Sequence, residues 1–254
     1  MLFACGLFTV IASDGQPPHG RIALYLAAVL ASQMAIGVHN DYCDRVLDGA
    51  AKQGRAIPSG LISPRRALEL TAVLIVLSVV FAMPLGPHVV ALGVLGTAMG
   101  FLYNASAKST VWAWAPFSIA LPTMAVASFA VVDATSQELL LAYPLALPLV
   151  LPVYIADSLI DLQSDRTHGS RGLVARIGPA WARALCWGSL LLGFAIAIAF
   201  WPDGGAPGVL SAIALGLLGL GIVSDRLRIP RVHWIGVMLA SVALAADWLL
   251  DIGA

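Results

Sequence analysis

The sequence predicts an all-α, polytopic membrane protein with about nine transmembrane helices. Hydrophobic residues make up 59% of its 254 residues and charged residues only 11%, whereas about a quarter of a soluble domain is charged. Apolar runs that could cross a bilayer as helices recur along the chain, since one crossing needs about 20 residues. The loops between these runs separate by charge, as loops on the two sides of a membrane do. No basic run alternates with aromatic residues, so we expect no nucleic-acid partner.

The apolar runs give the expected helices in chain order. The first run, at 2–12, is short, and we read it as a helix whose start is clipped rather than as a signal peptide, because no Lys or Arg precedes it. Prolines inside the later runs are expected to kink their helices, and Asp247 is expected at a membrane interface. Eight further runs qualify or nearly so: 21–40, 67–85, 88–103, 111–132, 138–156, 181–201, 207–224 and 232–250.

The positive charges predict which side of the membrane each loop faces. With the loop after residue 40 placed inside, all but one of the 14 Lys and Arg residues fall on that side, which the positive-inside rule assigns to the cytoplasm. The exception is Arg21, and the opposite loops carry acids such as Asp133 and Glu138. We expect an integral protein of the inner or plasma membrane, with the N-terminus inside, the C-terminus outside and the long loops 41–66 and 157–180 cytoplasmic.

The first long loop opens on a cluster of oxygen ligands. Asn40, Asp44 and Asp48 are four residues apart, and Asp41 lies three residues before Asp44, so a helix that continues past the apolar run would gather them on one face. Carboxylates at this spacing repel one another unless a cation lies among them, and a hard dication prefers carboxylate and amide oxygens. An ordinary solvated helix end is the alternative, but Asp is a poor helix former away from an N-cap.

A second acid cluster follows far downstream, in the other long loop. Asp157, Asp161 and Asp165 are again spaced by four, and Arg166 and Arg171 follow them. Each cluster ends an apolar run and has basic residues after it, a layout suited to metal ions that bridge a diphosphate while arginines meet its remaining oxygens. We interpret the chain as one domain, 1–254, with two loosely repeated halves at about 1–110 and 111–254. The cysteines Cys5, Cys43 and Cys186 show no metal-site or disulfide spacing.

At these residues the chain resembles the UbiA-type superfamily of intramembrane prenyltransferases. The resemblance covers essentially the whole chain, and its motifs are specific. The departures are Ala56 where a proline is usual, the missing prolines between Tyr103 and Lys108, and a different stretch at 172–174. The matching positions are Asn40, Asp41, Asp44 and Asp48; Arg55, Ile57, Pro58, Ser59 and Gly60; Tyr103 and Lys108; and Asp161, Asp165 and Gly169.

The resemblance implies a helical bundle around a central, lipid-accessible cavity, where an isoprenoid tail lies while its diphosphate meets Mg²⁺ at the cytoplasmic rim. Ionisation of the carbon–oxygen bond would form an allylic cation, which a small-molecule acceptor would attack. Tyr103 would face this cation or orient the diphosphate. The expected metal ligands are Asn40, Asp41, Asp44, Asp48, Asp157, Asp161 and Asp165. The expected diphosphate-binding residues are Asn40, Arg55, Lys108, Arg166 and Arg171, and the expected catalytic residues are Asp44, Tyr103, Lys108 and Asp161.

Two other functions fit parts of the pattern. A terpene cyclase of the same superfamily would form the same cation and close it on its own chain. A transporter would place acids near the membrane midplane on broken helices, whereas the acids here gather at one face. We therefore expect a prenyltransferase acting on an electron-rich aromatic or lipid-like acceptor. The residues do not select the acceptor, the prenyl chain length or the oligomeric state.

Overall fold

The protein is helical throughout the part of the chain that its structure describes. The computed structural model describes residues 2–13, 16, 18–51, 55–160, 162, 172–201, 207–227 and 229–252, apart from the side chains of residues 47–51 and 230. Every regular element in these ranges is a helix, so the predicted all-α class is confirmed. Seven described helices are long and apolar enough to cross a membrane, and two shorter apolar helices accompany them. These account for the nine expected helices of an integral membrane protein.

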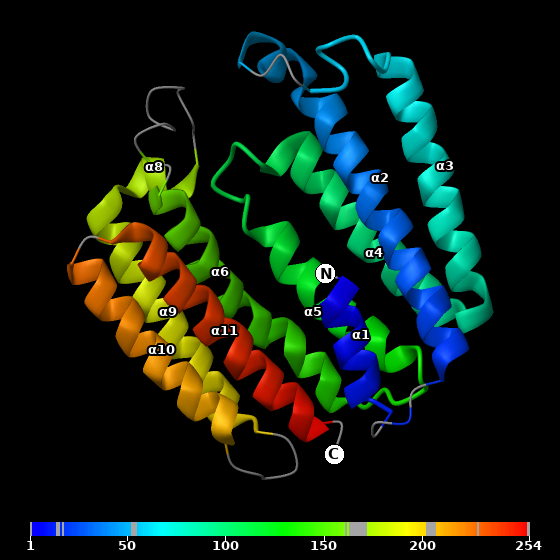
Figure 1. Ribbon diagram of the computed structural model, residues 1–254. Helices are drawn as coiled ribbons and strands as arrows, with labels where there is room; N and C mark the ends of the chain where they lie inside the picture. Colours follow the sequence, from blue (N-terminus) through cyan, green and yellow to red (C-terminus); the bar gives the residue numbers. More distant parts are fainter. Residues whose placement is uncertain are drawn as a thin grey trace. The chain divides into compact units, whose positions relative to one another are not determined.

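The chain divides into two compact units, residues 1–108 with 123–135 and residues 109–122 with 136–254. The arrangement as one domain of two loosely repeated halves stays a prediction. One helix, α5 (Ala115–Ala130), begins in the second unit and ends in the first. The other elements of the first unit are α1 (Leu2–Ile11), α2 (His19–Ala51), α3 (Pro64–Ala82), η1 (Met83–Leu85), α4 (Pro87–Leu102) and η2 (Tyr103–Ala107) (Figure 1).

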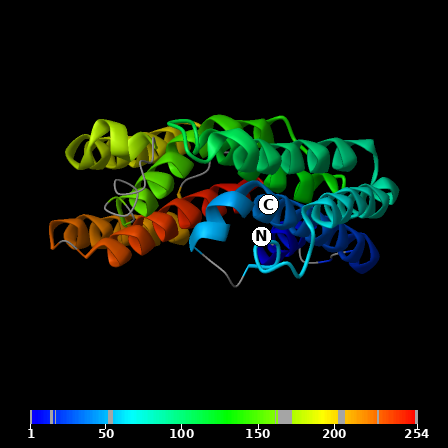
Figure 2. The same ribbon diagram turned by 90° about the horizontal axis from the view of Figure 1, so that it is seen from above.

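The first unit is built around α2, which packs against α1, α3 and α4. α3 runs alongside α2 in the opposite direction (Figures 1 and 2). Arg21, the one cation outside the positive-inside pattern, has hydrogen-bond and ion-pair partners just beyond the end of a helix. Arg21 Nε donates to the Val131 carbonyl oxygen over 2.5 Å, beyond the end of α5, and its Nη2 lies 3.4 Å from Asp133 Oδ2. This guanidinium therefore satisfies a carbonyl group that the helix itself leaves unpaired.

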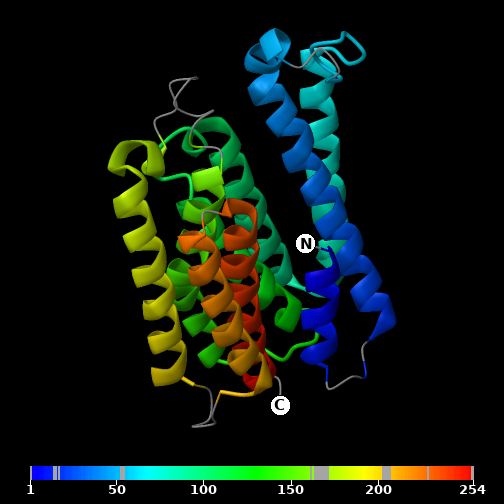
Figure 3. The same ribbon diagram turned by 60° about the vertical axis from the view of Figure 1, so that its left-hand side comes forward.

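The second unit contains the C-terminal helices, among which α6 packs against α9 and α11. α9, α10 and α11 lie next to one another (Figures 1 and 3). Its elements besides the start of α5 are η3 (Glu138–Leu141), α6 (Ala142–Ile160), α8 (Leu173–Ile177), α9 (Pro179–Ala199), α10 (Val209–Arg226) and α11 (Pro230–Ile252).

Prolines inside α6 are compensated by side chains of α9. Pro152 has no N–H, so the carbonyl of Pro148 four residues earlier loses its helical partner. Ser189 Oγ of α9 donates to that carbonyl oxygen over 3.2 Å, and Cys186 Sγ lies 3.5 Å from the carbonyl oxygen of Pro152. Neighbouring helices are the expected source of such bonds where no water can supply them. The prolines thus fix which face of α6 meets α9.

Glycine allows α10 and α11 to approach closely. A Cβ atom on Gly236 of α11 would lie 3.0 Å from the Cα atom and 3.1 Å from the nitrogen atom of Gly221 on α10. Backbone atoms cannot move aside as a flexible side chain can, so any larger residue at 236 would push the two helices apart. Small residues at such crossings are the usual basis of helix packing in membranes.

Asp247 of α11 caps the first turn of α10. It lies near the end of its span, as expected for an interfacial residue, but its side chain is only 8% exposed and is enclosed by protein. Asp247 Oδ2 accepts from the backbone nitrogen atoms of Gly208 and Ser211 over 2.7 and 3.0 Å, and from Ser211 Oγ over 2.6 Å. Helix N-termini favour an anionic acceptor, so this carboxylate joins two helices.

Candidate active site

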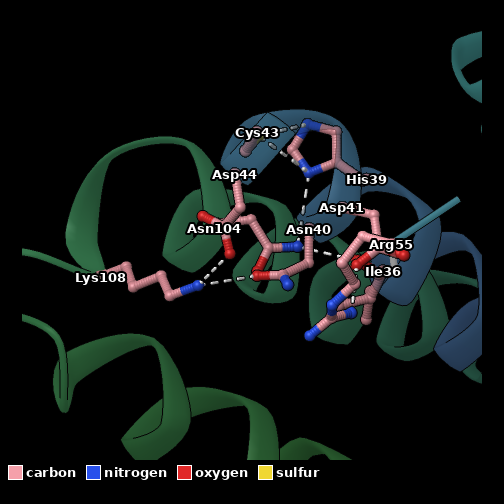
Figure 4. Close-up of polar contacts among 9 residues, drawn as sticks. All are labelled: Ile36, His39, Asn40, Asp41, Cys43, Asp44, Arg55, Asn104 and Lys108. Atoms are coloured by element: carbon pink, nitrogen blue, oxygen red, sulfur yellow. Dashed lines mark hydrogen bonds and ion pairs between the residues drawn. The ribbon is translucent and has the colours of Figure 1, made fainter. Parts of the chain in front are cut away.

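The candidate site starts on α2, which continues well past its apolar segment. The helix extends over 33 residues, through Asn40, Asp41 and Asp44 to Ala51. No proline interrupts it, so nothing in the backbone ends the helix where the apolar residues stop. Asn40 and Asp44 are one turn apart and point to the same side (Figure 4). The spacing of the first acid motif therefore becomes a row of oxygen atoms along the end of this helix.

Lys108 meets that row from the segment that follows α4. Its Nζ atom donates to Asn40 Oδ1 over 3.2 Å and to Asp44 Oδ2 over 2.5 Å (Figure 4). The Asp44 side chain is 19% exposed and that of Lys108 is 40% exposed. One ammonium group thus bonds to two members of the acid motif that are four residues apart on α2. The Lys108 side chain is thus partly buried against α2 and partly accessible to a ligand.

A second cation reaches the motif from the loop after α2. Arg55 Nη1 lies 2.7 Å from Asp41 Oδ1, with the two side chains 45% and 32% exposed. The loop turns back at once, because Ser59 N donates to the Arg55 carbonyl oxygen over 3.0 Å and Gly60 N to that of Ile57 over 3.0 Å. Gly60 adopts φ +78, a conformation that glycine takes without strain. The Arg-Ala-Ile-Pro-Ser-Gly segment is therefore a compact turn that presents its arginine to the acid motif.

The segment that carries Lys108 is a π-helix. In η2, Lys108 N donates to the carbonyl oxygen of Tyr103 over 3.0 Å, five residues back instead of four. Asn104 in this turn is 8% exposed, and its Nδ2 donates to the Ile36 carbonyl oxygen on α2 over 2.9 Å. Single π-turns often mark functional positions in helices. Here the wider turn brings Tyr103 and Lys108 of the predicted site into one short segment.

The structure describes only some of the remaining predicted site residues. Tyr103 is half-buried in η2, and Asp157 is exposed near the end of α6 in the second unit. The side chain of Asp48 and the residues Asp161, Asp165, Arg166 and Arg171 lie outside the described residues. The structure brings together Asn40, Asp41, Asp44, Arg55 and Lys108.

Two further residues lie next to this cluster, and reasoning from the sequence did not identify one of them, Asn104. Asn104 lies between Tyr103 and Lys108, but no spacing rule for an α-helix indicates that its side chain reaches α2. His39 directly precedes the acid motif, and the structure places its ring 4.5 Å from that of Phe101 and its Nδ1 atom 3.4 Å from Asn104 Nδ2. A polar residue near the end of an apolar run, as His39 is in the run 21–40, was the one available signal.

The donor set fits a magnesium ion in its chemistry. One amide oxygen and two carboxylates lie along the end of α2, and oxygen ligands of this kind are what Mg²⁺ takes in proteins. Within the described residues, no group of three His, Cys, Asp or Glu side chains lies close enough to hold a metal. Asn40, Asp41 and Asp44 could therefore supply part of a coordination shell, which further oxygens would complete.

Comparison with known proteins identifies the family. The sequence profile of the UbiA prenyltransferase family matches residues 1–233. The chain belongs to this family. A 4-hydroxybenzoate octaprenyltransferase of Vibrio atlanticus is 32% identical over 96 residues, which are 37% of this chain and 34% of that protein. This alignment therefore spans about a third of the relative's length. The corresponding enzyme of Shewanella loihica is 25% identical over 271 residues, covering 98% of this chain and 92% of that protein.

Solved structures with the same fold include two UbiA homologues. A digeranylgeranylglyceryl phosphate synthase superposes with a TM-score of 0.76 at 15% identity, over 98% of this chain and 93% of that one. A UbiA homologue from Aeropyrum pernix gives 0.75 at 21% identity, over 98% and 97%. A UbiA homologue from Archaeoglobus fulgidus, bound to GPP and Mg²⁺, gives 0.71 at 16% identity, over 100% and 96%. At these identities the likeness establishes the fold.

Proposed function

We propose that this family member is a Mg²⁺-dependent intramembrane prenyltransferase, which moves an isoprenyl group from a prenyl diphosphate to an electron-rich acceptor. The observation that carries the proposal is the cluster in which Lys108 and Arg55 meet Asn40, Asp41 and Asp44. A metal diphosphate presents cations and anionic oxygens side by side, and this cluster offers a partner for each. Membership of the UbiA prenyltransferase family and the GPP and Mg²⁺ bound by the Archaeoglobus fulgidus homologue support it.

Each side chain has a part in the departure of the diphosphate. Asn40, Asp41 and Asp44 would hold Mg²⁺, and Asp48, Asp157, Asp161 and Asp165 would provide further oxygen ligands. Arg55, Lys108, Arg166 and Arg171 bind the remaining diphosphate oxygens. When bound, Mg²⁺ neutralises the negative charge that the leaving group gains. The carbon–oxygen bond breaks with both electrons staying on the diphosphate, and donors fixed in advance around that charge lower the barrier.

The allylic cation then reacts with the acceptor. Tyr103, half-buried in η2, orients the diphosphate or faces the cation with its ring. The acceptor supplies the electron pair of the new carbon–carbon or carbon–oxygen bond and releases a proton. An aromatic acceptor is supported by the relatives named 4-hydroxybenzoate octaprenyltransferase, and a lipid-like one by the synthase of digeranylgeranylglyceryl phosphate. A central cavity open to the lipid would hold the tail, and the cluster would face the cytoplasm.

Metal-dependent diphosphate release by the detergent-purified full chain tests this function. The protein is incubated with geranyl, farnesyl or geranylgeranyl diphosphate, with and without Mg²⁺, first alone and then with a hydroxybenzoate or a prenylated glycerol phosphate. We expect release that needs both the metal and one acceptor, and mass spectrometry identifies the prenylated product. Release without acceptor, with a cyclic product, would contradict a transferase and indicate a cyclase.

The acid ligands provide the control within the same assay. Asp44→Ala and Asp161→Ala should abolish release while the detergent-solubilised protein stays folded. Near-normal turnover by either variant would contradict its assignment to the metal site.

A further inference from the structure

We propose that Asn104 is a positioning residue, which holds η2 in register with α2 and so sets Lys108 against Asn40 and Asp44. The inference rests on the proposed function and adds to it a side chain that hydrogen-bonds to Ile36 and His39, just before the acid motif. Asn104 is 8% exposed, and its Nδ2 lies 2.9 Å from the Ile36 carbonyl oxygen. A carbonyl oxygen only accepts, so the amide nitrogen of Asn104 must face it.

The second N–H of that amide points to His39. Asn104 Nδ2 lies 3.4 Å from His39 Nδ1 (Figure 4), and since Asn104 donates, His39 Nδ1 accepts and its proton is on Nε2. His39 Nε2 lies 3.7 Å from Cys43 Sγ, one turn further along α2. Asn104 thus contacts the turn of α2 that leads directly into the acid motif, on both its backbone and a side chain.

The contacts between α2 and η2 keep one register. Asn104 pairs with Ile36, and Lys108 pairs with Asn40, and each pair is separated by 68 positions. The two segments therefore run parallel, and Asn104 is an anchor four residues before the lysine. The approach is close on the preceding turn as well, because a Cβ atom on Gly100 would lie 2.5 Å from Ile36 Cδ1. A shift of η2 along α2 would move Lys108 from Asn40 and Asp44.

Loss of this bond should affect alignment more than helix formation. In a continuous α-helix the Ile36 carbonyl oxygen also accepts from the backbone nitrogen of Asn40, so α2 retains its own bond when Asn104 is replaced. The bond that is lost is the one between Asn104 of η2 and the Ile36 carbonyl of α2, which holds these two elements together. Misplacement of catalytic groups by about 1 Å lowers rates by up to about 100-fold.

Asn104→Leu tests the inference, because leucine has a similar size and no donor. Ser106→Ala is the matched control, since Ser106 is exposed in the same π-turn and its Oγ donates to the Leu102 carbonyl oxygen, within the same segment. For Asn104→Leu we expect kcat to fall by about 10- to 100-fold and the Mg²⁺ concentration for half-maximal rate to rise. The KM for the acceptor and the unfolding temperature should stay close to those of the control. Turnover and Mg²⁺ dependence like the control's, or loss of heat stability with a normal kcat, would overturn the positioning role.

A second readout does not depend on the reaction. Cys5 and Cys186 are fully buried, whereas Cys43 is partly exposed next to His39, so maleimide modification of the folded protein reports the local geometry of this turn. We expect Asn104→Leu to change the modification rate of Cys43 several-fold and Ser106→Ala to leave it unchanged. An unchanged rate in Asn104→Leu overturns the inference even if no prenyl diphosphate proves to be a substrate. Should Asn104→Leu fail to fold, Asn104→Asp, which keeps the shape but not the amide donors, takes its place in both assays.

Discussion

At the scale of single residues, the site depends on one lysine that bonds to two oxygen ligands at once. Lys108 and the pair Asn40 and Asp44 come from segments more than 60 positions apart. The spacing of acids on α2 and the Tyr-to-Lys motif are visible in the sequence, so the membership of the cluster could be predicted. Their direct contact could not, because the residues of an apolar helix do not reveal which face meets its neighbour.

Replacement of Lys108 by methionine should weaken the stabilisation of the departing diphosphate while the protein stays folded. Methionine keeps the length of the side chain but no charge, so we expect kcat/KM for the prenyl diphosphate to fall by about 100-fold, about 2.7 kcal/mol of transition-state stabilisation. Diphosphate release at several substrate concentrations measures it.

Arg65→Met provides the control for Lys108→Met, because it also removes one positive charge. Arg65 is 90% exposed and pairs with Glu69 on the surface of α3, where an ion pair contributes little. Its variant should match the unmodified protein. Equal losses in the two variants would mean that Lys108 acts through overall charge and has no specific bond to the diphosphate.

At the scale of elements, buried polar groups decide how the helices meet. The existence of the helices and their approximate ends follow from the apolar runs, and the expected kinks at prolines identify α6 as unusual. The side chains that bond to the proline carbonyl oxygens cannot be predicted from the sequence, since Ser189 and Cys186 look like ordinary small residues of an apolar segment. The same holds for Asp247, whose place near a span end suggests an interface. Its role as a cap for α10 depends on a contact between helices that no local rule contains.

Asp247→Ala should lower the thermal stability of the purified protein. The change leaves Gly208 N and Ser211 N without their acceptor, and loss of an N-cap costs about 0.5–2 kcal/mol. Asp247→Asn retains an acceptor oxygen and should lie between Asp247→Ala and the unmodified protein. The temperature at which half of the protein aggregates in detergent gives the order of the three. Identical temperatures for all three would show that the cap contributes nothing.

At the scale of the whole molecule, charge asymmetry predicts the orientation in the membrane. All but one of the 14 Lys and Arg residues fall on the side that the sequence assigns to the cytoplasm, and the exception, Arg21, is bound by carbonyl and carboxylate oxygens at the end of α5. The helical fold and the family were predictable at this scale, because hydropathy and motif spacing are properties of the whole chain. The arrangement of its two units was not, since it depends on packing that an all-apolar surface does not specify.

Labelling from one side of the membrane should locate the candidate site. A membrane-impermeant maleimide should modify Cys43 in inside-out vesicles and leave it unmodified in right-side-out ones, because the positive-inside rule places the end of α2 in the cytoplasm. Thr135→Cys in a Cys43→Ser background is the matched control, since Thr135 is exposed in a loop assigned to the other side. It should show the reverse pattern. Modification of Cys43 from the outer side would invert the proposed orientation.

The π-turn at 103–107 also bears on how the motif can vary between related chains. A π-turn holds one residue more than an α-turn over nearly the same rise, because its hydrogen bond spans five positions. Deletion of one residue there could return the turn to α geometry and leave the following residues facing as before. A lysine that lies five positions after a tyrosine in one chain can then correspond to one that lies four positions after it in another. Insertions in this segment are therefore better judged by the direction of the side chain than by counting residues.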